Sequence, residues 1–374
     1  MSTTKTNTSG TSSSSSSVLR ALSLHGYQMG PKIGKGSFSC VRLAKWVSKN
    51  KNVRTLACKV IDVRKGTEEF IKKFFPRELS VLMKIRHPNI VKVHSILKRE
   101  RMVFIFMDYA EGGDLLKFIN QNGSVPEGQA KQWFAQLVSA LRYLHSNDIA
   151  HRDLKCENIL LSRTNAIQLA DFGFARICGE ETGLFSETYC GSAAYAAPEV
   201  ILGKPYNPMI ADIWSLGIIL FIMLNAVMPF DDRNLKKLVE DHRTRNFAFE
   251  EQAGKLLSME AQRTVYELLN PEPERRISLD QLVELRWIDE NSAKEKRRTL
   301  GELCGRKASG LGSTRDRQEG CKVGEQEEQE AVGILRGSWV QGPPVDAGVL
   351  VMAVNFESHP MMMMMGQLKW ENEK

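Results

Sequence analysis

Paired cysteines are absent from this sequence. The seven cysteines are odd in number, and no two are spaced as Cys-x-x-Cys. They are Cys40, Cys58, Cys156, Cys178, Cys190, Cys304 and Cys321. This scatter argues against a disulfide framework and against a zinc site, and it indicates reduced thiols in a cytosolic or nuclear setting.

Long apolar segments are absent as well. The N-terminus has no apolar core of the kind that signal peptides carry, and Ser2 stands where N-myristoylation needs glycine. The longest apolar run, at residues 218–224, is too short to span a bilayer and predicts a buried helix. We therefore expect a soluble protein, cytoplasmic or also nuclear, with no membrane partner.

No strongly basic arm is present. The net charge of +7 is spread along 374 residues, so the chain fits a protein that meets anionic ligands but not one that binds nucleic acid. An apolar content of 42% and a charged content of 25% are typical of a globular chain long enough to bury a large core.

The two ends of the chain lack the periodicity of a folded domain. Residues 1–26 are dominated by Ser and Thr, with an unbroken serine run at 12–17, and predict a disordered tail. Residues 289–374 contain a basic stretch, an acidic stretch and five consecutive methionines, and predict a low-order tail with no second domain. We have no physical account of the methionine run.

Residues 151–158, His-Arg-Asp-Leu-Lys-Cys-Glu-Asn, are the densest in chemistry, and Asp171-Phe172-Gly173 comes soon after them. A carboxylate, a cation and an amide this near a second carboxylate suit phosphoryl transfer from a metal-bound nucleotide. Asp153 would orient and deprotonate an attacking hydroxyl, and Lys155 would steady the charge on the phosphate. Asn158 and Asp171 would hold Mg²⁺. Asp-Phe-Gly alone is a common turn, and His-Arg-Asp alone is hardly more specific. The prediction therefore depends on finding both in this order.

Residues 33–41, Ile-Gly-Lys-Gly-Ser-Phe-Ser-Cys-Val, place glycines between two β-prone runs. A hairpin over phosphates needs such small residues so that backbone N–H groups can approach, although Gly-x-Gly alone also fits a plain hairpin. Lys59 then interrupts an apolar strand at 56–61, where an unpaired ammonium would be costly. Glu78, in a helical-looking segment at 70–85, is the candidate partner for Lys59, although many Lys–Glu pairs are only surface salt bridges.

An amphipathic core helix is predicted at residues 130–145. Its apolar residues recur at i, i+3 and i+4, and they are Trp133, Phe134, Leu137, Val138, Leu141 and Leu144. His145 is expected to be structural. Further along, a phosphate on Thr188 could bridge Arg152 and Arg176 and so order the segment 171–199 through charge-assisted hydrogen bonds.

In combination these motifs resemble the protein kinase domain, over residues 27–288. The order His-Arg-Asp-Leu-Lys-x-x-Asn…Asp-Phe-Gly resembles the kinase catalytic and metal loops, and Ala197-Pro198-Glu199 closes the segment that begins at Asp171. The family pattern in the glycine-rich hairpin is Gly-x-Gly-x-x-Gly, and Ser39 stands at its third glycine. That glycine is the most replaceable of the three in kinases. Several stretches look like the testis-specific serine/threonine kinases of the calmodulin-dependent-kinase-like branch. These are residues 75–78, 151–161 with Cys156 where proline is usual, 171–175, 188–192 and 229–237.

The resemblance implies an α+β fold of two lobes with ATP and Mg²⁺ between them. A small, mostly β N-lobe with one key helix would cover about 27–107, a hinge 108–114, and a larger, mostly α C-lobe 115–288. The residues implied for nucleotide binding are Ile33, Gly34, Lys35, Gly36, Ser37, Phe38, Ser39, Val41, Ala57, Lys59, Met107, Asp108, Ala110, Asp114 and Leu160. Lys59 would grip the α- and β-phosphates, oriented by Glu78, and Met107 would be the gatekeeper.

The resemblance also implies framework contacts. Asp212 would brace the backbone of the catalytic loop, and Arg276 would form a buried ion pair with Glu199. Ser192 would lie beside Asp153 and Lys155, the arrangement of kinases that act on Ser and Thr.

The implied partners are protein substrates, an upstream activating kinase and a chaperone, with the chain acting as a monomer. Asp114 and Glu157 match acidic positions that favour arginine upstream of the target residue. A role in sperm formation is implied by the subfamily alone.

Two other interpretations predict different residues at these positions. A pseudokinase scaffold, binding nucleotide with little transfer, would be expected to lack Lys59, Asp153, Asn158 or Asp171, and all four are present. A P-loop ATPase or small-molecule kinase would need Gly-x-x-x-x-Gly-Lys-Ser/Thr, which residues 34–41 do not match. The prediction is a serine/threonine protein kinase, with the pseudokinase as the alternative.

Overall fold

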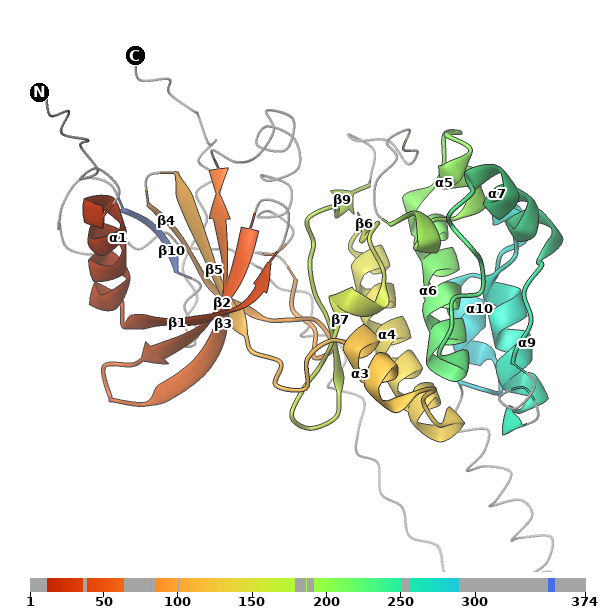
Figure 1. The fold of residues 1–374 in the computed structure, drawn as a ribbon, viewed down its shortest axis with the longest axis horizontal. Coiled ribbons are helices and arrows are strands. Elements are labelled where there is room, and N and C mark those ends of the chain that lie inside the picture. The colour runs from red at the N-terminus through yellow and green to blue at the C-terminus, as the bar shows by residue number, and fades with distance from the viewer. Residues whose placement is uncertain are drawn as a thin grey trace, which may run out of the picture.

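The computed structural model describes most of the expected domain and parts of both ends of the chain. The described residues are 12–35, 39–63, 82, 85–99, 101–178, 186, 192–250, 254, 256–288 and 349–353, with only the backbone described at 12–17 and 349–353. Figure 1 shows two lobes, one dominated by strands and the other by helices. The predicted α+β fold of two lobes is confirmed.

The smaller lobe is one antiparallel sheet. Its strand order is β1-β2-β3-β5-β4-β10, and every neighbouring pair is antiparallel. The strands are β1 (Tyr27–Lys35), β2 (Ser39–Val47), β3 (Val53–Asp62), β4 (Val93–Arg99), β5 (Met102–Asp108) and β10 (Val349–Ala353). The strands β1, β2 and β3 follow one another in the chain and in the sheet, so they form a meander. Strands β1 and β2 flank residues 36–38 of the predicted phosphate hairpin, which lie outside the described residues.

Alternation along the strands gives this sheet two different faces. On β5, Ile105 belongs to the core shared with the helical lobe, whereas its neighbours Phe104 and Phe106 belong to a second, smaller core on the opposite face. Successive side chains of a strand point to opposite faces, so this split is expected from the sequence pattern. The face that carries Lys59 and Met107 is the one turned toward the helical lobe.

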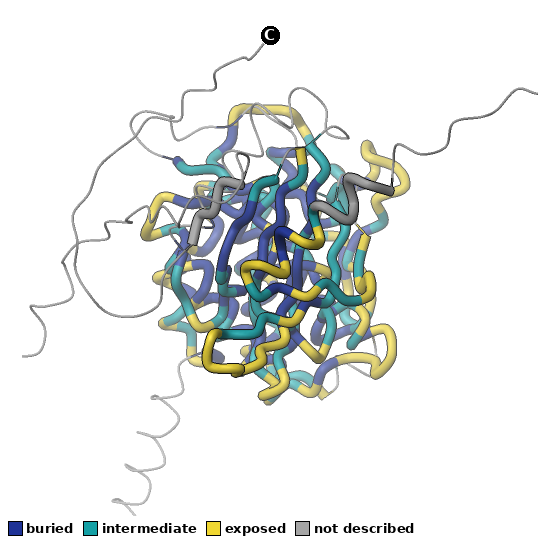
Figure 2. The backbone as a smooth tube through the Cα atoms, turned by 90° about the vertical axis from the view of Figure 1, so that its left-hand side faces the viewer, coloured by how far each residue is buried: buried dark blue, intermediate teal, exposed yellow. Residues whose placement is uncertain are grey.

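The larger lobe is built around two helices, α4 (Glu127–Ser146) and α6 (Pro208–Asn225). The other helices of this lobe whose bounds are described are α3 (Leu115–Asn122), α5 (Pro198–Ile201), α7 (Leu235–Thr244), α9 (Met259–Leu268) and α10 (Leu279–Glu284). The short strands are β6 (Ile149–Ala150), β7 (Ile159–Leu161), β8 (Ile167–Leu169) and β9 (Arg176–Ile177). Figure 2 shows buried backbone in the interior and exposed turns around it.

The predicted core helix and the predicted buried apolar run are both confirmed. All six apolar residues singled out in the segment 130–145 are buried on α4. The run at 218–224 lies within α6, whose 18 residues have a mean hydropathy of 1.8 and are 78% buried inside the protein. By length and composition α6 could cross a membrane, but its burial makes it the central helix of the lobe's core.

One segment of each predicted tail has regular structure, and the remaining residues, 1–11, 289–348 and 354–374, lie outside the described residues. Residues Ser12–Leu24 form a helix, α1, and residues Val349–Ala353 form β10, which pairs with β4. The prediction of disorder rested on the serine run and so overlooked Val18, Ala21 and Leu22, which have helical spacing. In the C-terminal segment, Val-Leu-Val-Met-Ala is a β-prone run that fits the open edge of a sheet.

A buried histidine makes the stability of the helical lobe dependent on pH. His242 on α7 packs against the rings of Trp214 and Phe230, at centroid distances of 4.7 and 4.4 Å. Among the described residues neither of its ring nitrogens has a hydrogen-bond partner. Burial, with a smaller contribution from the charge of Arg276, lowers the pKa of His242 from 6.5 to about 4, against the opposing effect of Asp241.

The stability is therefore expected to fall in acid. The unfolded chain takes up a proton on His242 near its ordinary pKa, whereas the folded chain does not until near pH 4. Between about pH 7.5 and about pH 5 this one group should cost about 2 kcal/mol of unfolding free energy. Urea unfolding of wild type and His242→Phe at both pH values measures the difference; an equal pH slope in the two proteins would contradict it.

Candidate active site

A cavity of about 560 Å³ lies between the two lobes. This volume is in the range of sites that hold nucleotide-sized ligands. Of the residues predicted to bind nucleotide, the structure places these around it: Ile33, Gly34, Lys35, Ser39, Val41, Ala57, Lys59, Met107, Asp108, Ala110, Asp114 and Leu160. Gly36, Ser37 and Phe38 lie outside the described residues. The cavity therefore gathers one set of residues from β1, β2, β3 and β5 and another from β7.

The segment joining β5 to α3 borders this cavity and is tied to the helical lobe. Gly112 N–H donates to the carbonyl of Leu161 at 2.9 Å, and Leu161 N–H donates to the carbonyl of Gly113 at 2.8 Å. A Cβ on Gly112 would lie 2.8 Å from the Cβ of Leu161, so only glycine allows this approach. The connection between the lobes is thus held against β7, next to Leu160.

Two carboxylates of this connection have partners that sequence reasoning missed. Asp108 accepts hydrogen bonds from His94 Nε2 at 2.7 Å and from Arg54 Nη2 at 3.2 Å. Burial alone would raise the pKa of Asp108, but the hydrogen bond from His94 and the nearby positive charges lower it. Asp114 caps α3 by accepting from Lys117 N–H at 2.9 Å, and its second oxygen lies 2.9 Å from Lys117 Nζ.

The catalytic loop is pinned by one buried aspartate. Asp212 on α6 accepts from the backbone N–H of His151 and of Arg152, both at 2.8 Å, and lies 3.1 Å from His145 Nε2. Arg152 has a positive φ of 66°, a conformation that costs energy for a residue other than glycine. The contacts of Asp212 hold the loop in that conformation. The predicted brace and the structural role of His145 are therefore both seen.

Asp153 is buried, and its two carboxylate oxygens differ in their hydrogen-bond partners. Oδ2 lies 2.7 Å from Lys155 Nζ and accepts from Asn158 Nδ2 at 3.0 Å. Oδ1 is buried too, yet it has no hydrogen-bond partner among the described residues. A buried acceptor without a donor is costly, so this atom can take a donor that the described part of the chain does not provide.

Asn158 and Asp171 offer oxygens that fit a magnesium ion. The amide nitrogen of Asn158 donates to the carbonyl and to Oδ2 of Asp153, at 2.8 and 3.0 Å, which leaves its carbonyl oxygen for another ligand. Both residues line the cavity. Amide and carboxylate oxygens are the ligands that Mg²⁺ prefers.

Lys59 and Asp171 meet across the cavity. Lys59 Nζ donates to Asp171 Oδ1 at 3.0 Å, and Gly173 N–H donates to the same oxygen at 3.2 Å. The charge of Lys59 is the largest of several effects that lower the pKa of Asp171. Asp171 has a φ of 62°, so this turn is held in a strained conformation. Glu78, the predicted partner of Lys59, lies outside the described residues.

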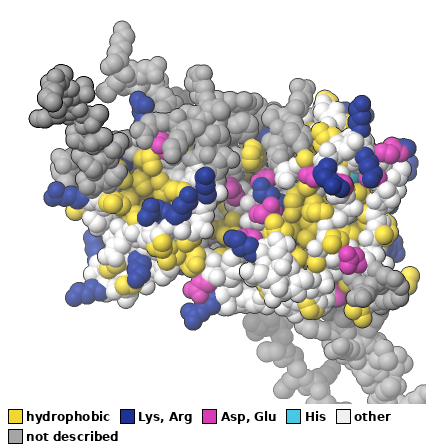
Figure 3. Space-filling model, viewed as in Figure 1, with side chains coloured by type: hydrophobic (Ala, Val, Ile, Leu, Met, Phe, Trp, Pro, Cys, Tyr) yellow, Lys and Arg dark blue, Asp and Glu magenta, His cyan; other side chains and the backbone are white. Residues whose placement is uncertain are grey.

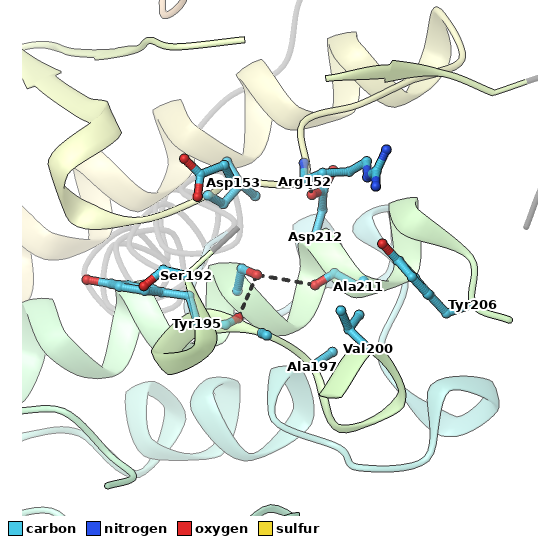
Figure 4. A pocket seen from close by; sticks show the side chains of 12 residues that line it. Arg152, Asp153, Ser192, Tyr195, Ala197, Val200, Tyr206, Ala211 and Asp212 are labelled. Atoms are coloured by element: carbon cyan, nitrogen blue, oxygen red, sulfur yellow. Dashed lines mark hydrogen bonds between the residues drawn. The ribbon is translucent and has the colours of Figure 1, made fainter. Parts of the chain in front are cut away.

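A small second cavity is bordered by Asp153 (Figure 4). It is lined by Arg152, Asp153, Leu154, Ser192, Tyr195, Ala196, Ala197, Val200, Tyr206, Ala211, Asp212 and Ser215. Ser192, predicted to lie beside Asp153, shares this cavity with it. Ser215 on α6 donates to the carbonyl of Tyr195 at 2.8 Å, one of the dashed bonds in Figure 4, and so anchors the loop beside the catalytic residues.

The predicted buried ion pair closes the same loop. Arg276 donates to both oxygens of Glu199, at 2.7 and 3.0 Å, and has no exposed side-chain surface. Arg176 pairs with Ala150, two residues before Arg152, so the two predicted phosphate-binding arginines come from adjacent segments. Thr188 lies outside the described residues.

Comparisons with known proteins agree with this geometry. The pattern of the protein kinase domain matches residues 27–288. The chain is 42% identical over 274 residues to mouse testis-specific serine/threonine-protein kinase 1, covering 71% of this chain and 73% of that protein. It is 40% identical over 265 residues to mouse testis-specific serine/threonine-protein kinase 3, covering 71% and 96%. A plant relative, CBL-interacting serine/threonine-protein kinase 7 of Arabidopsis thaliana, is 34% identical over 263 residues, covering 70% and 60%.

Proposed function

The chain belongs to the protein kinase family, among the serine/threonine kinases, and from that premise we propose which residues perform each part of phosphoryl transfer. The reaction moves the γ-phosphate of ATP to a Ser or Thr hydroxyl of a protein substrate. The observation that carries the proposal is the buried Asp153, with one oxygen bonded to Lys155 and Asn158 and the other without a partner among the described residues.

Asp153 acts on the substrate hydroxyl. Its Oδ1 accepts the hydrogen bond of the attacking hydroxyl and then its proton, while Lys155 and Asn158 keep Oδ2 in place. Because the carboxylate is fixed before the substrate arrives, little reorganisation is needed at the moment of reaction. Lys155 Nζ lies 2.7 Å from Asp153, next to the place where the phosphate would reach the hydroxyl. Its positive charge would therefore offset negative charge on the phosphate during transfer.

The nucleotide would occupy the cavity between the lobes. Lys59 would hold its α- and β-phosphates, and the apolar side chains of Val41, Ala57 and Leu160, which line the cavity, would enclose the adenine. Asn158 and Asp171 would hold Mg²⁺, which supplies positive charge next to the phosphate oxygens. Lys59 and Asp171 are only 3.0 Å apart, so their contact lengthens or is shared when phosphate binds.

We propose that the protein substrate is basic near its target residue. Asp108 and Asp171 already hold cationic partners, so the carboxylates considered for a substrate arginine are Asp114 and Glu157, which also line the cavity. Figure 3 likewise shows acidic side chains gathered near the middle of this face. Asp114 is already paired with Lys117, whereas Glu157 is exposed, so Glu157 is the stronger candidate for an upstream arginine.

A transfer assay on the full chain tests the function. The protein is incubated with labelled ATP, Mg²⁺ and peptide arrays that vary the acceptor and the upstream residues, and the labelled amino acid is identified. We expect label on Ser and Thr but not Tyr, a preference for upstream arginine, and no transfer once EDTA removes the metal. Nucleotide binding without transfer, even after treatment with an activating kinase, would instead support the pseudokinase scaffold.

We also propose that phosphorylation of Thr188 activates the enzyme. A phosphate there would meet Arg152 and Arg176 and order the segment before Ser192. Thr188→Ala is expected to lower turnover of the activated protein by about tenfold, and Thr182→Ala, in the same segment, to leave it unchanged. Turnover of Thr188→Ala equal to that of wild type would end this part of the proposal.

The cellular setting is a proposal with two separate grounds. The mammalian relatives are named as testis-specific kinases, which supports a role in sperm formation. The proposed location, in the cytoplasm and also in the nucleus, rests on the scattered cysteines of the sequence. An upstream kinase and a chaperone are the proposed partners, and a monomer is the proposed state. Localisation of the tagged chain in developing sperm cells, and its elution volume on size exclusion, test these points.

A further inference from the structure

Helix α1 precedes the kinase domain, yet one of its faces is buried. Leu22 is only 3% exposed and Ala21 only 8%, and Val18 is partly buried beside them. Leu19 and Leu24 on the same helix are 52% and 72% exposed. This division into a buried and an exposed face is what a docked amphipathic helix shows, and not what a tail with fluctuating structure would show.

The surface under α1 is the face of the N-lobe sheet turned away from the nucleotide cavity. Leu22 packs in one apolar cluster with Tyr27, Ala44, Leu56, Cys58, Val60, Leu97, Phe104 and Phe106. In Figure 1, α1 lies at the side of the sheet away from the helical lobe. Without the helix, the large side chains of β4 and β5 in this cluster would form an exposed apolar patch, which soluble proteins rarely leave uncovered.

The junction between α1 and β1 is short and tightly bonded. Gly26 N–H donates to the carbonyl of Ser23 at 3.0 Å, and Val47 N–H donates to the carbonyl of Gly26 at 2.9 Å. Gly26 has a φ of 81°, and a Cβ there would lie 2.5 Å from the Val47 oxygen. These contacts therefore fix the C-terminal end of α1 against both β1 and β2.

Tyr27 carries this contact to the strand that leads into the hinge. Its ring stacks on Phe106 of β5, with centroids 3.8 Å apart and planes at 20°. Its hydroxyl shares a hydrogen bond of 2.6 Å with Ser95 Oγ on β4, in a buried position. Phe106 directly precedes Met107 and Asp108, both of which line the nucleotide cavity from the opposite face.

We propose that α1 contributes to nucleotide binding by the kinase domain. Leu22 of α1 and Tyr27 of β1 are positioning residues for the nucleotide site. The docked helix holds Phe106 from behind and so sets the position of Met107 and the hinge in front. The inference rests on the proposed function only in taking the ligand of this cavity to be ATP.

The test compares two serine substitutions on opposite faces of one helix, in the full chain. Leu22→Ser removes the buried contact, and Leu19→Ser makes the same chemical change on the exposed face. The readouts are the Kd for a fluorescent ATP analogue, the KM for ATP, kcat and the Tm. We expect Leu22→Ser to raise Kd and KM roughly fivefold with kcat nearly unchanged, and Leu19→Ser to alter none of them.

Each other result counts against the proposal. A lower Tm for Leu22→Ser with an unchanged Kd would mean that α1 only covers the sheet, and identical behaviour of both variants would mean that it does not dock. If Leu22→Ser does not fold, Leu22→Ala and Tyr27→Phe, which keeps the stack but loses the Ser95 bond, should still raise Kd about twofold. An unchanged Kd in both would overturn the proposal. Because Kd needs no transfer, an inactive wild type would refute the proposed function without deciding this one.

Discussion

Replacing Asp153 with asparagine is expected to lower kcat by about a thousandfold while leaving nucleotide affinity and fold unchanged. The exchange keeps the shape of the side chain but removes its charge and its capacity to take a proton. One of the two carboxylate oxygens would also be replaced by an amide NH2, which is a donor. It would face either Lys155 Nζ or the substrate hydroxyl, where only an acceptor fits. The loss should therefore lie in the chemical step and not in binding.

The measurement separates these possibilities. Steady-state kinetics gives kcat and the KM for ATP, and a melting curve verifies the fold. Glu157→Gln is the matched control, because it removes a neighbouring carboxylate that does not touch Asp153 in the structure. That control should keep turnover on a peptide without arginine. A loss of less than about tenfold in Asp153→Asn would show that another group removes the proton.

Local motifs made most of this site predictable from sequence. Asp153, Lys155 and Asn158 lie within six residues, so their contacts are fixed by one loop, and spacing alone brings them together. Alternation sets the faces of β3 and β5 and puts Lys59 and Met107 on one cavity wall, but Met107 was assigned to the nucleotide site by the resemblance to kinases and not by periodicity. Helical periodicity was likewise sufficient for α4, whose buried residues are those the pattern predicts.

Contacts between distant elements were not predictable in this way. The pairing of Asp108 with His94 and Arg54 joins three strands, and no spacing rule links those positions. The resemblance to kinases supplied Asp212 and the Glu199–Arg276 pair, which periodicity would not have found. Asp114 shows the opposite limit: its partner Lys117 is only three residues away, but the family comparison assigned Asp114 to ligands and so drew attention from its role as a helix cap.

Helix α1 was missed because composition outweighed pattern. Its six consecutive serines dominate any average over residues 1–26, whereas only Val18, Ala21 and Leu22 decide whether it docks. Its stability comes from packing on the sheet rather than from the helical propensity of serine, which is modest. A docked segment of this kind is recognised from sequence only if its apolar face is weighed together with the surface that it covers.

The Glu199–Arg276 pair should be the most costly ion pair to break in the described part of the chain. Arg276 donates to both carboxylate oxygens and to the carbonyls of Ile210 and Asn270, both at 2.9 Å, and its guanidinium carbon lies 5.3 Å from the centre of the Trp214 ring. Its side chain is fully buried, and that of Glu199 is 11% exposed. Arg276→Met would leave the carboxylate without its counter-ion, at a cost of about 3–5 kcal/mol, and would lower the Tm by about 10 °C.

A double substitution distinguishes the unpaired charge from the lost packing. In Glu199→Leu/Arg276→Met no charge remains to be desolvated, so more than half of the lost stability should return. Arg243→Ala is the control for an exposed pair: Arg243 and Glu240 are 70% and 57% exposed, and breaking their contact should leave the Tm nearly unchanged. If the double variant were as unstable as Arg276→Met, the cost would come from packing around Trp214 and the two carbonyls. The pair would then hold the loop by its shape, and its charge would matter little.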